Sequence, residues 1–91
     1  MKVLVLYRPR SEHRSAVEEF IRQYKSQYPG SQIEEHDVDQ EDGAMMASLY
    51  DVMSYPVIVV VRDDGSVTQS WQGEDTLPGP SDVNYFASAQ V

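Results

Sequence analysis

The sequence predicts one α/β domain in which a mixed four-stranded sheet carries helices on both faces. The chain has 91 residues, which leaves room for a single compact domain over residues 1–91. Short aliphatic runs alternate along it with stretches whose apolar residues recur at helical spacing, in the order β-α-β-α-β-β-α. A right-handed crossover makes the first two strands parallel, and a hairpin makes the last two antiparallel.

The first strand and the first helix come from the N-terminal third of the chain. Residues Lys2 to Tyr7 form a short aliphatic run that a proline soon follows, as expected of a buried strand. An apolar stripe at helical spacing comes next, and Pro29-Gly30 ends it. The helix start is open between Ser11 and Ser15, because either can cap and Ser15 makes a capping box with Glu18. The stripe consists of Val17, Phe20, Ile21, Tyr24 and Tyr28.

The middle of the chain predicts a second strand and a second helix. Gln32 to Val38 alternates weakly and is rich in charge, which favours an exposed edge strand. A helix is expected from Gly43 to Met53, with Asp42 as its capping residue. Its inner stripe is expected to consist of Met46, Leu49, Tyr50 and Met53.

The last third predicts a buried strand, a hairpin and a short helix. Pro56 to Val61 is the most apolar segment, as in a strand that is buried on both faces. Asp63-Asp64-Gly65 is a hairpin signal, and Ser66 to Gln72 then returns as an antiparallel strand. A loop from Gly73 to Pro80 follows. Ser81 is expected to cap the last helix, with its inward face formed by Val83, Phe86 and Ala87.

This order of elements, together with three local stretches, resembles the thioredoxin-like fold over roughly residues 2–90. Asp37 to Gln40 is similar to the end of the family's second strand. Val52 to Pro56, followed by the valine-rich strand, is similar to the family's cis-proline loop. Asp64 to Val67 and Trp71 to Gly73 are similar to the terminal hairpin and the glycine that borders the substrate groove. The resemblance implies a cis Tyr55–Pro56 peptide bond and a groove lined by Tyr55, Pro56 and Gly73.

The redox centre of the family is missing from this chain. Thioredoxins and glutaredoxins carry Cys-x-x-Cys between the first strand and the first helix, where this sequence reads Ser11 to Arg14 or, one residue later, Glu12 to Ser15. The cysteine count is 0, and Val5 replaces the acid that the family buries in strand one. Disulfide exchange requires an attacking thiolate. We therefore expect a redox-inactive domain that has no cofactor and lacks the family's oxidoreductase activity.

The charge is acidic overall, with one basic cluster. Lys and Arg number 7 and Asp and Glu number 15, which gives a formal net charge of −8. This balance argues against nucleic acid and anionic membranes as partners. Arg8, Arg10, His13 and Arg14 surround the expected start of the first helix, where unpaired N–H groups favour an anion. The alternative is that these side chains only offset the surrounding acidic charge.

Catalytic and metal-binding interpretations of this stretch find little support. Ser11, Glu12 and His13 include the residue types of a hydrolytic triad, but consecutive residues at a helix start project in different directions. The two histidines and the acids also lack the spacing of metal ligands. We expect neither a catalytic residue nor a metal site.

The sequence therefore predicts a module that binds a protein or an extended peptide, with acidic side chains favoured by the basic cluster. The alternative is an enzyme or carrier for glutathione or another small anion, in which the ligand supplies the thiol. A cysteine-free assembly protein is a third possibility. Without a long apolar segment or a signal peptide, we expect a cytoplasmic monomer. The expected binding residues are Arg10, Ser11, Glu12, His13 and Arg14 before and at the first helix, and Tyr55, Pro56 and Gly73 in the groove.

Overall fold

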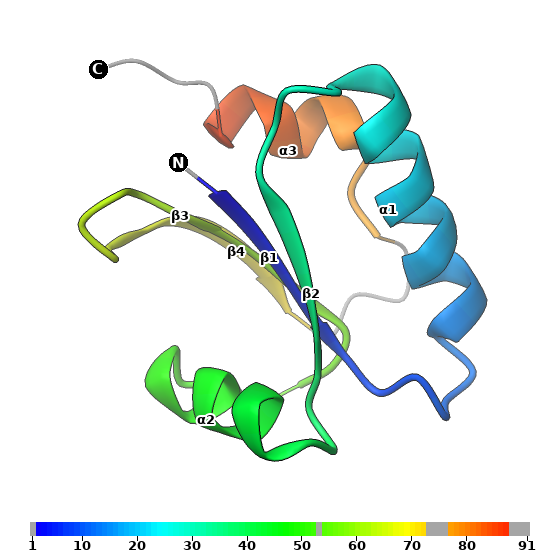
Figure 1. The fold of residues 1–91 in the computed structure, drawn as a ribbon, viewed down its shortest axis with the longest axis vertical. Coiled ribbons are helices and arrows are strands. Elements are labelled where there is room, and N and C mark those ends of the chain that lie inside the picture. The colour runs from blue at the N-terminus through cyan, green and yellow to red at the C-terminus, as the bar shows by residue number, and fades with distance from the viewer. Residues whose placement is uncertain (1, 53, 73–76, 88–91) are drawn as a thin grey trace.

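The predicted order of strands and helices is confirmed in a computed structural model, which describes residues 2–52, 54–72 and 77–87 (Figure 1). Gly73 and Met53 lie outside the described residues. The elements are β1 (Lys2–Tyr7), α1 (Arg14–Gln27), β2 (Ile33–Asp37), α2 (Glu41–Leu49), β3 (Val57–Val61), β4 (Val67–Gln72) and α3 (Pro80–Ala87).

The four strands form one sheet in the order β2-β1-β3-β4. β1 runs parallel to β2 and antiparallel to β3, and β4 pairs antiparallel with β3. The predicted parallel and hairpin pairings are therefore confirmed, and β2 lies at an edge as expected. All five residues of β3 are buried, which confirms that this strand is covered on both faces.

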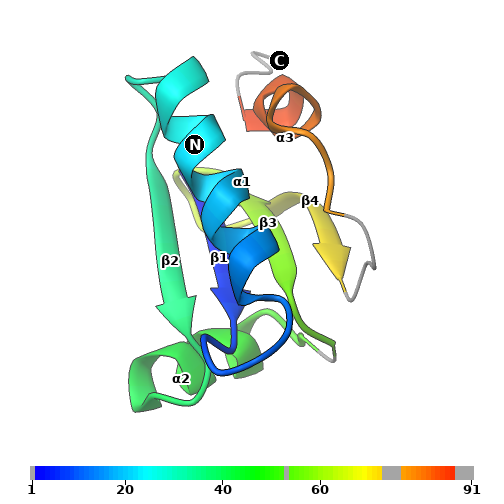
Figure 2. The same cartoon turned by 90° about the vertical axis from the view of Figure 1, so that its right-hand side faces the viewer.

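The helices divide between the two faces of the sheet. α1 and α3 cover one face, and α2 lies against the other (Figures 1 and 2). Alternate residues of β1 point to opposite faces, so that Val3 and Val5 join the core beneath α1 and α3. Leu4 and Leu6 join the smaller core beneath α2.

Helix α1 has the predicted buried face but a different start. Its four buried residues all belong to the predicted stripe. The helix begins at Arg14, with His13 at the N-cap position, so neither Ser11 nor Ser15 is the capping residue. Ser15 lies inside the helix, and Glu18 accepts from Arg14 Nε at 2.8 Å rather than closing a capping box. No side chain caps this end, and the backbone N–H of Arg14 donates to the carbonyl oxygen of Ser11 at 3.3 Å.

Helix α2 has different bounds from those predicted. It begins at Glu41 with Gln40 at the N-cap position, and it ends at Leu49. The expected span of Gly43 to Met53 and the expected cap at Asp42 are therefore wrong. Asp42 lies in the first turn, where a carboxylate is stabilised by the helix dipole without being the cap.

The predicted inner stripe of α2 is confirmed in part, since Met46 and Tyr50 pack against the core beneath the helix. Gly43 and Ala47 are its buried residues, whereas Leu49 is 70% exposed. A Cβ added to Gly43 would lie 2.0 Å from the carbonyl oxygen of Asp37. The helix backbone therefore contacts the end of β2 directly at Gly43, where no side chain fits.

Helix α3 begins at Pro80, so Ser81 is inside the helix and does not cap it. The N–H groups of Asp82 and Val83 donate to the carbonyl oxygen of Gly79, and a proline suits the first turn because its missing N–H needs no partner there. The expected inward face is confirmed, since Val83 is fully buried and Phe86 and Ala87 pack against the same core.

Candidate functional site

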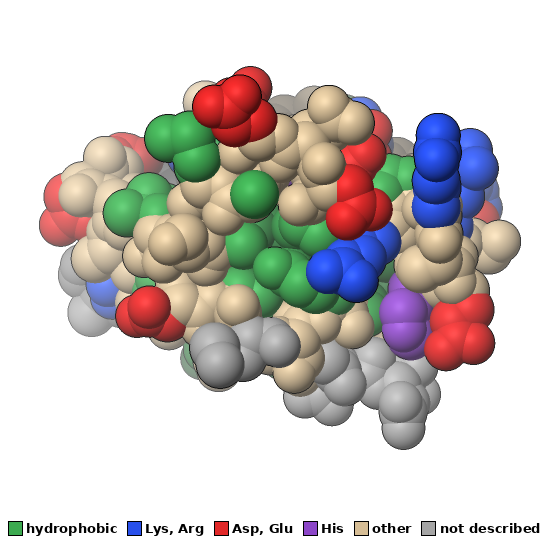
Figure 3. All heavy atoms as spheres, turned by 90° about the horizontal axis from the view of Figure 1, so that it is seen from below, with side chains coloured by type: hydrophobic (Ala, Val, Ile, Leu, Met, Phe, Trp, Pro, Cys, Tyr) green, Lys and Arg blue, Asp and Glu red, His purple; other side chains and the backbone are tan. Residues whose placement is uncertain are grey.

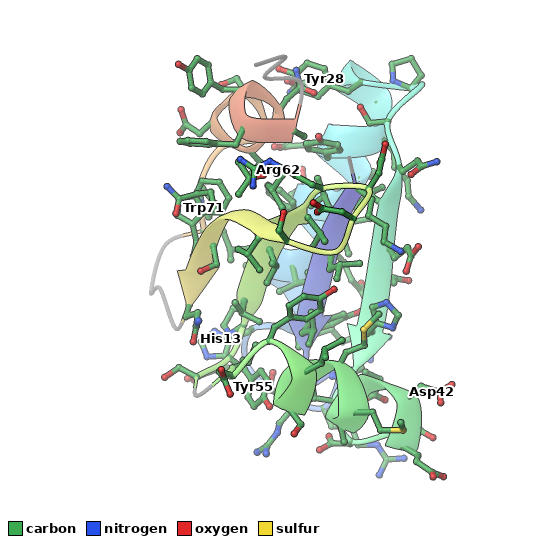
Figure 4. The ribbon with its side chains drawn as sticks, turned by 90° about the vertical axis from the view of Figure 1, so that its left-hand side faces the viewer. His13, Tyr28, Asp42, Tyr55, Arg62 and Trp71 are labelled. Atoms are coloured by element: carbon green, nitrogen blue, oxygen red, sulfur yellow. The ribbon has the colours of Figure 1, made fainter. Side chains whose placement is uncertain are left out.

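An open hollow of about 420 Å³ lies where β1 ends and β3 begins. Figure 3 looks onto this end of the molecule, where hydrophobic side chains form the middle of the surface and a histidine and charged groups stand at one side. Figure 4 shows His13 and Tyr55 at the same end of the sheet. We name this feature the Tyr55 hollow, and its lining residues are Tyr7, Arg8, Ser11, Glu12, His13, Ser54, Tyr55 and Pro56.

The segment before α1 is held by the hydroxyl of Ser11. Ser11 Oγ donates to the carbonyl oxygen of Arg8 at 2.6 Å and accepts from the backbone N–H of His13 at 3.3 Å. Nε2 of His13 lies 3.9 Å from Oε1 of Glu12. The serine hydroxyl thus organises the backbone of the loop, which is the behaviour of a turn residue and not of a nucleophile paired with a histidine ring.

Arg8 connects the two sides of the hollow. Its guanidinium carbon lies 5.5 Å from the centre of the Tyr55 ring, within the range of a cation–π contact. Its Nε is also 3.5 Å from Oδ1 of Asp39. Arg8 therefore lies between an aromatic ring of the groove and a carboxylate beyond β2.

Tyr7 forms the floor of the hollow at the end of β1. It is buried, and this burial raises the pKa of its phenol, with Glu35 and Glu18 adding to the effect and Arg14 opposing it. A raised pKa keeps the hydroxyl protonated and therefore able to donate a hydrogen bond.

The other wall is the loop that leads into β3. The Tyr55–Pro56 peptide bond is cis, Pro56 is buried and Tyr55 is half-buried. Sheet pairing of β3 begins only at Val57, opposite Leu6 on one side and Gln72 on the other. The backbone of Ser54 and Tyr55 consequently lies beyond both ladders.

Not all of the predicted binding residues gather in the hollow. The residues brought together are Ser11, Glu12, His13, Tyr55 and Pro56. Arg10 and Arg14 do not line it, and Arg14 pairs with Glu18 along α1. Gly73 lies outside the described residues.

Three lining residues were not among the predicted binding residues: Tyr7, Arg8 and Ser54. Tyr7 could have been found as the aromatic residue that ends a central strand. A side chain at that position can reach the surface at the end of the sheet where β1 stops. Arg8 belongs to the basic cluster noted in the sequence, but nothing there indicates its contact with Tyr55. Ser54 carries no signal beyond its place next to the groove.

The part of the chain that the structure describes has neither a metal-binding cluster nor a membrane-spanning helix. No three His, Asp or Glu side chains in it come together as a metal site would require. None of its helices is both long and apolar enough to cross a membrane.

The comparisons with known proteins support the fold. No protein-family model matches the chain, and no curated protein sequence matches it. The structure of a malarial protein matches with a TM-score of 0.70 and 14% identity, over 92% of this chain and 89% of that one. Oxidized mitochondrial thioredoxin 3 of Saccharomyces cerevisiae matches with a TM-score of 0.67 and 17% identity, over 90% of this chain and 71% of that one.

These matches confirm the thioredoxin-like fold that the sequence predicts. The chain combines this fold with a complete absence of cysteine. The Tyr55 hollow is therefore built from side chains that cannot carry out dithiol exchange.

Proposed function

We propose that the chain binds an extended segment of a partner protein in the Tyr55 hollow, without redox chemistry. The observation that carries this proposal is the position of Ser54 and Tyr55. Their backbone lies beyond both strand ladders of β3 and forms one wall of a hollow of about 420 Å³. Backbone groups in this position can pair with an added strand.

The chemistry of the walls suits a peptide with mixed side chains. The ring of Tyr55 and the buried Pro56 offer apolar surface, whereas the opposite wall offers the exposed carboxylate of Glu12 and the half-buried imidazole of His13. An extended segment presents alternate side chains to opposite sides, so it can satisfy both walls while its backbone pairs with the loop.

The glutathione or small-anion alternative has less support from the geometry. Arg14 is engaged by Glu18 at 2.8 Å, and Arg8 is 3.5 Å from Asp39. An anion at either guanidinium would lie beside a carboxylate that is already in place and would be repelled by it. A neutral peptide backbone meets no such repulsion.

The proposal is tested by selecting binders from a random library of short peptides and measuring their affinity for matched variants. Ser54→Trp fills the hollow from an exposed position, and Ser26→Trp makes the same change at an exposed position of α1. We expect Ser54→Trp to weaken binding by about tenfold or more and Ser26→Trp by less than about twofold. Amide NMR shifts should be largest at residues 7–13 and 54–56.

Two results would contradict the proposal. One is selected peptides that bind Ser54→Trp as well as the parent chain. The other is a set of amide shifts that map to a different face. Titration with glutathione alone serves as the competing arm, because saturable binding there, lost in Arg14→Ala, would favour the small-anion alternative.

A further inference from the structure

A second surface stands out because it exposes large hydrophobic side chains. Among the described residues, four large hydrophobic side chains are exposed: Met45 at 64%, Leu49 at 70%, Val67 at 45% and Tyr85 at 69%. The first three lie on α2 and on the start of β4, and Tyr85 lies on α3. A cluster of three around one short helix is more than scattered exposure, and such patches mark interaction sites.

Two hollows flank this cluster, and Leu49 lines both. One, of about 480 Å³, is lined by His36, Asp42, Met45, Met46 and Leu49. The other, of about 450 Å³, is lined by Leu49, Tyr50, Asp51, Gly65 and Val67. We name the apolar side chains of these two hollows the α2 surface: Met45, Met46, Leu49, Tyr50 and Val67.

The surroundings of the α2 surface are acidic. Each hollow contains one carboxylate, Asp42 in the first and Asp51 in the second. Glu41 lies beside Asp42 in the first turn of α2, and this helix contains no Lys or Arg.

The basic groups near these hollows have acidic neighbours of their own. Nε2 of His36 is 3.2 Å from Oε1 of Glu34. Arg62, at the base of the hairpin, lies near Asp64, whose pKa is lowered by hydrogen bonds from Ser66 and by the Arg62 charge. The field around the exposed apolar side chains therefore favours a cationic partner.

The α2 part of this surface offers side chains and not backbone groups, whereas Val67 begins the edge strand β4. The backbone N–H and C=O groups in the middle of α2 are bonded within the helix, so an added strand would find no ladder there. A partner that satisfies its own backbone, as a helix does, fits such a surface. Methionine side chains are flexible and adapt to varied apolar anchors.

We propose that the α2 surface binds an amphipathic helix of a partner protein, with apolar anchors in the two hollows and Lys or Arg residues beside Asp42 and Asp51. A second copy of this chain is disfavoured, because it would bring like-charged acidic surfaces together. This binding mode is independent of the Tyr55 hollow, which has different lining residues and different charge.

The probe is a designed helical peptide with leucines along one face and lysines along the other, titrated into the chain by calorimetry and amide NMR. Two companion peptides have the same length. One has every lysine replaced by glutamate, and the other has the composition of the first in an order that breaks the apolar face. We expect the first peptide to bind at least about tenfold more tightly than either companion, with the largest shifts at residues 42–51 and 65–67.

Matched variants of the chain locate the contact. Leu49→Ser removes the side chain that the two hollows share, and Tyr85→Ser makes a comparable change at a side chain of nearly equal exposure on α3. We expect Leu49→Ser to weaken binding of the lysine peptide by at least about tenfold and Tyr85→Ser by less than about twofold. Because both side chains are exposed, both variants should fold.

Any one of several results overturns the proposal. The first is no binding of the lysine peptide up to about 1 mM. The others are equal affinity of the lysine and glutamate peptides, equal affinity of the lysine peptide and the peptide with the broken apolar face, and unchanged affinity for Leu49→Ser. Shifts that centre on residues 7–13 and 54–56 would also overturn it, and they would assign the peptide to the Tyr55 hollow. Concentration-dependent dimerisation that Leu49→Ser abolishes would show that a second copy occupies the surface instead.

Discussion

Helices α1 and α2 lie on opposite faces of one sheet, yet they contact it in opposite ways. α1 places large side chains between its backbone and the sheet. α2 places two small residues there, with the partly buried Met46 beside them, and exposes its other large side chains. The residues concerned are Val17, Phe20, Ile21 and Tyr24 on α1, Gly43 and Ala47 on the inner side of α2, and Met45 and Leu49 on its exposed side.

This difference shows when apolar spacing identifies a packing face. A stripe of large residues marks the buried side of a helix that side chains hold away from its neighbour. Where backbones touch, the buried side is marked by glycine and alanine, and large hydrophobic residues are left for other contacts. On α2 the exposed residues belong to the α2 surface. Leu49 was therefore wrongly predicted to be buried, and it now belongs to the proposed binding surface.

The largest effect should come from the packing face of α1. Phe20 is 4% exposed, and its ring centre lies 5.9 Å from that of Tyr24. Phe20→Ala is expected to lower the free energy of unfolding by about 3–5 kcal/mol, measured by urea denaturation. The exposed Ser26→Ala on the same helix should change it by less than about 0.5 kcal/mol. Similar values for the two variants would remove the contrast between the helices.

The close contact of α2 predicts the next largest effect. Alanine normally stabilises a helix by about 1 kcal/mol relative to glycine, but a Cβ on Gly43 would lie 2.0 Å from the Asp37 carbonyl oxygen and 2.5 Å from its carbon. Gly43→Ala is therefore expected to lower the free energy of unfolding by about 1–3 kcal/mol despite the better propensity. Gly30→Ala is the control, because its Cβ would meet nothing within 4 Å. A stabilised Gly43→Ala would contradict the backbone contact.

Most of the fold could be predicted because it depends on local patterns. The run from Val57 to Val61 has one simple explanation, a strand that is buried on both faces, and the stripe on α1 is equally direct. The bounds of α2 and the burial of Gly43 could not be predicted. They depend on the close approach of the Gly43 backbone to the carbonyl group of Asp37, at the other end of the connecting loop. Sequence spacing contains no information on how closely two backbones approach.

The candidate site was predicted in part, and the residues that were missed or misplaced have different causes. Ser11, Glu12 and His13 are consecutive in the sequence, so a prediction that places one of them at the site also places the other two. The contact of Arg8 with Tyr55 joins residues from two distant segments, and only the folded sheet brings them together. The pairing of Arg14 with Glu18 was open to prediction from their four-residue spacing, but the basic cluster suggested an anion instead.

A smaller effect tests how α1 is joined to α3. Tyr24 is fully buried. Its hydroxyl donates to Asn84 Oδ1 at 3.4 Å and is also hydrogen-bonded to the side chain of Ser31. Tyr24→Phe is expected to lower the free energy of unfolding by about 1 kcal/mol at neutral pH. A variant as stable as the parent chain would show that these hydrogen bonds do not support the α1 face.

The same variant predicts a pH dependence. Burial raises the pKa of Tyr24 above its ordinary value of 10.0, so above that pH the unfolded chain releases this proton while the folded chain still holds it. Stability from this group is therefore complete below pH 10 and is lost as pH rises through the raised pKa. Phenylalanine has no proton to lose, and the difference between parent and variant should shrink in urea titrations above about pH 10. A difference that is constant with pH would contradict the burial of the hydroxyl.

The smallest effect is expected at Leu49, and it tests the comparison most directly. If α2 packed as α1 does, Leu49→Ala would leave a cavity and cost about 2–5 kcal/mol. Because the side chain is 70% exposed, we expect a change of less than about 0.5 kcal/mol in urea denaturation. A loss of about 2 kcal/mol or more would show that Leu49 belongs to the core. The two hollows that Leu49 lines would then be closed. The surface that the proposed helical partner needs would be lost with them. A negligible loss would instead leave a large apolar side chain that contributes little to folding, as expected of one whose contacts are made with another molecule.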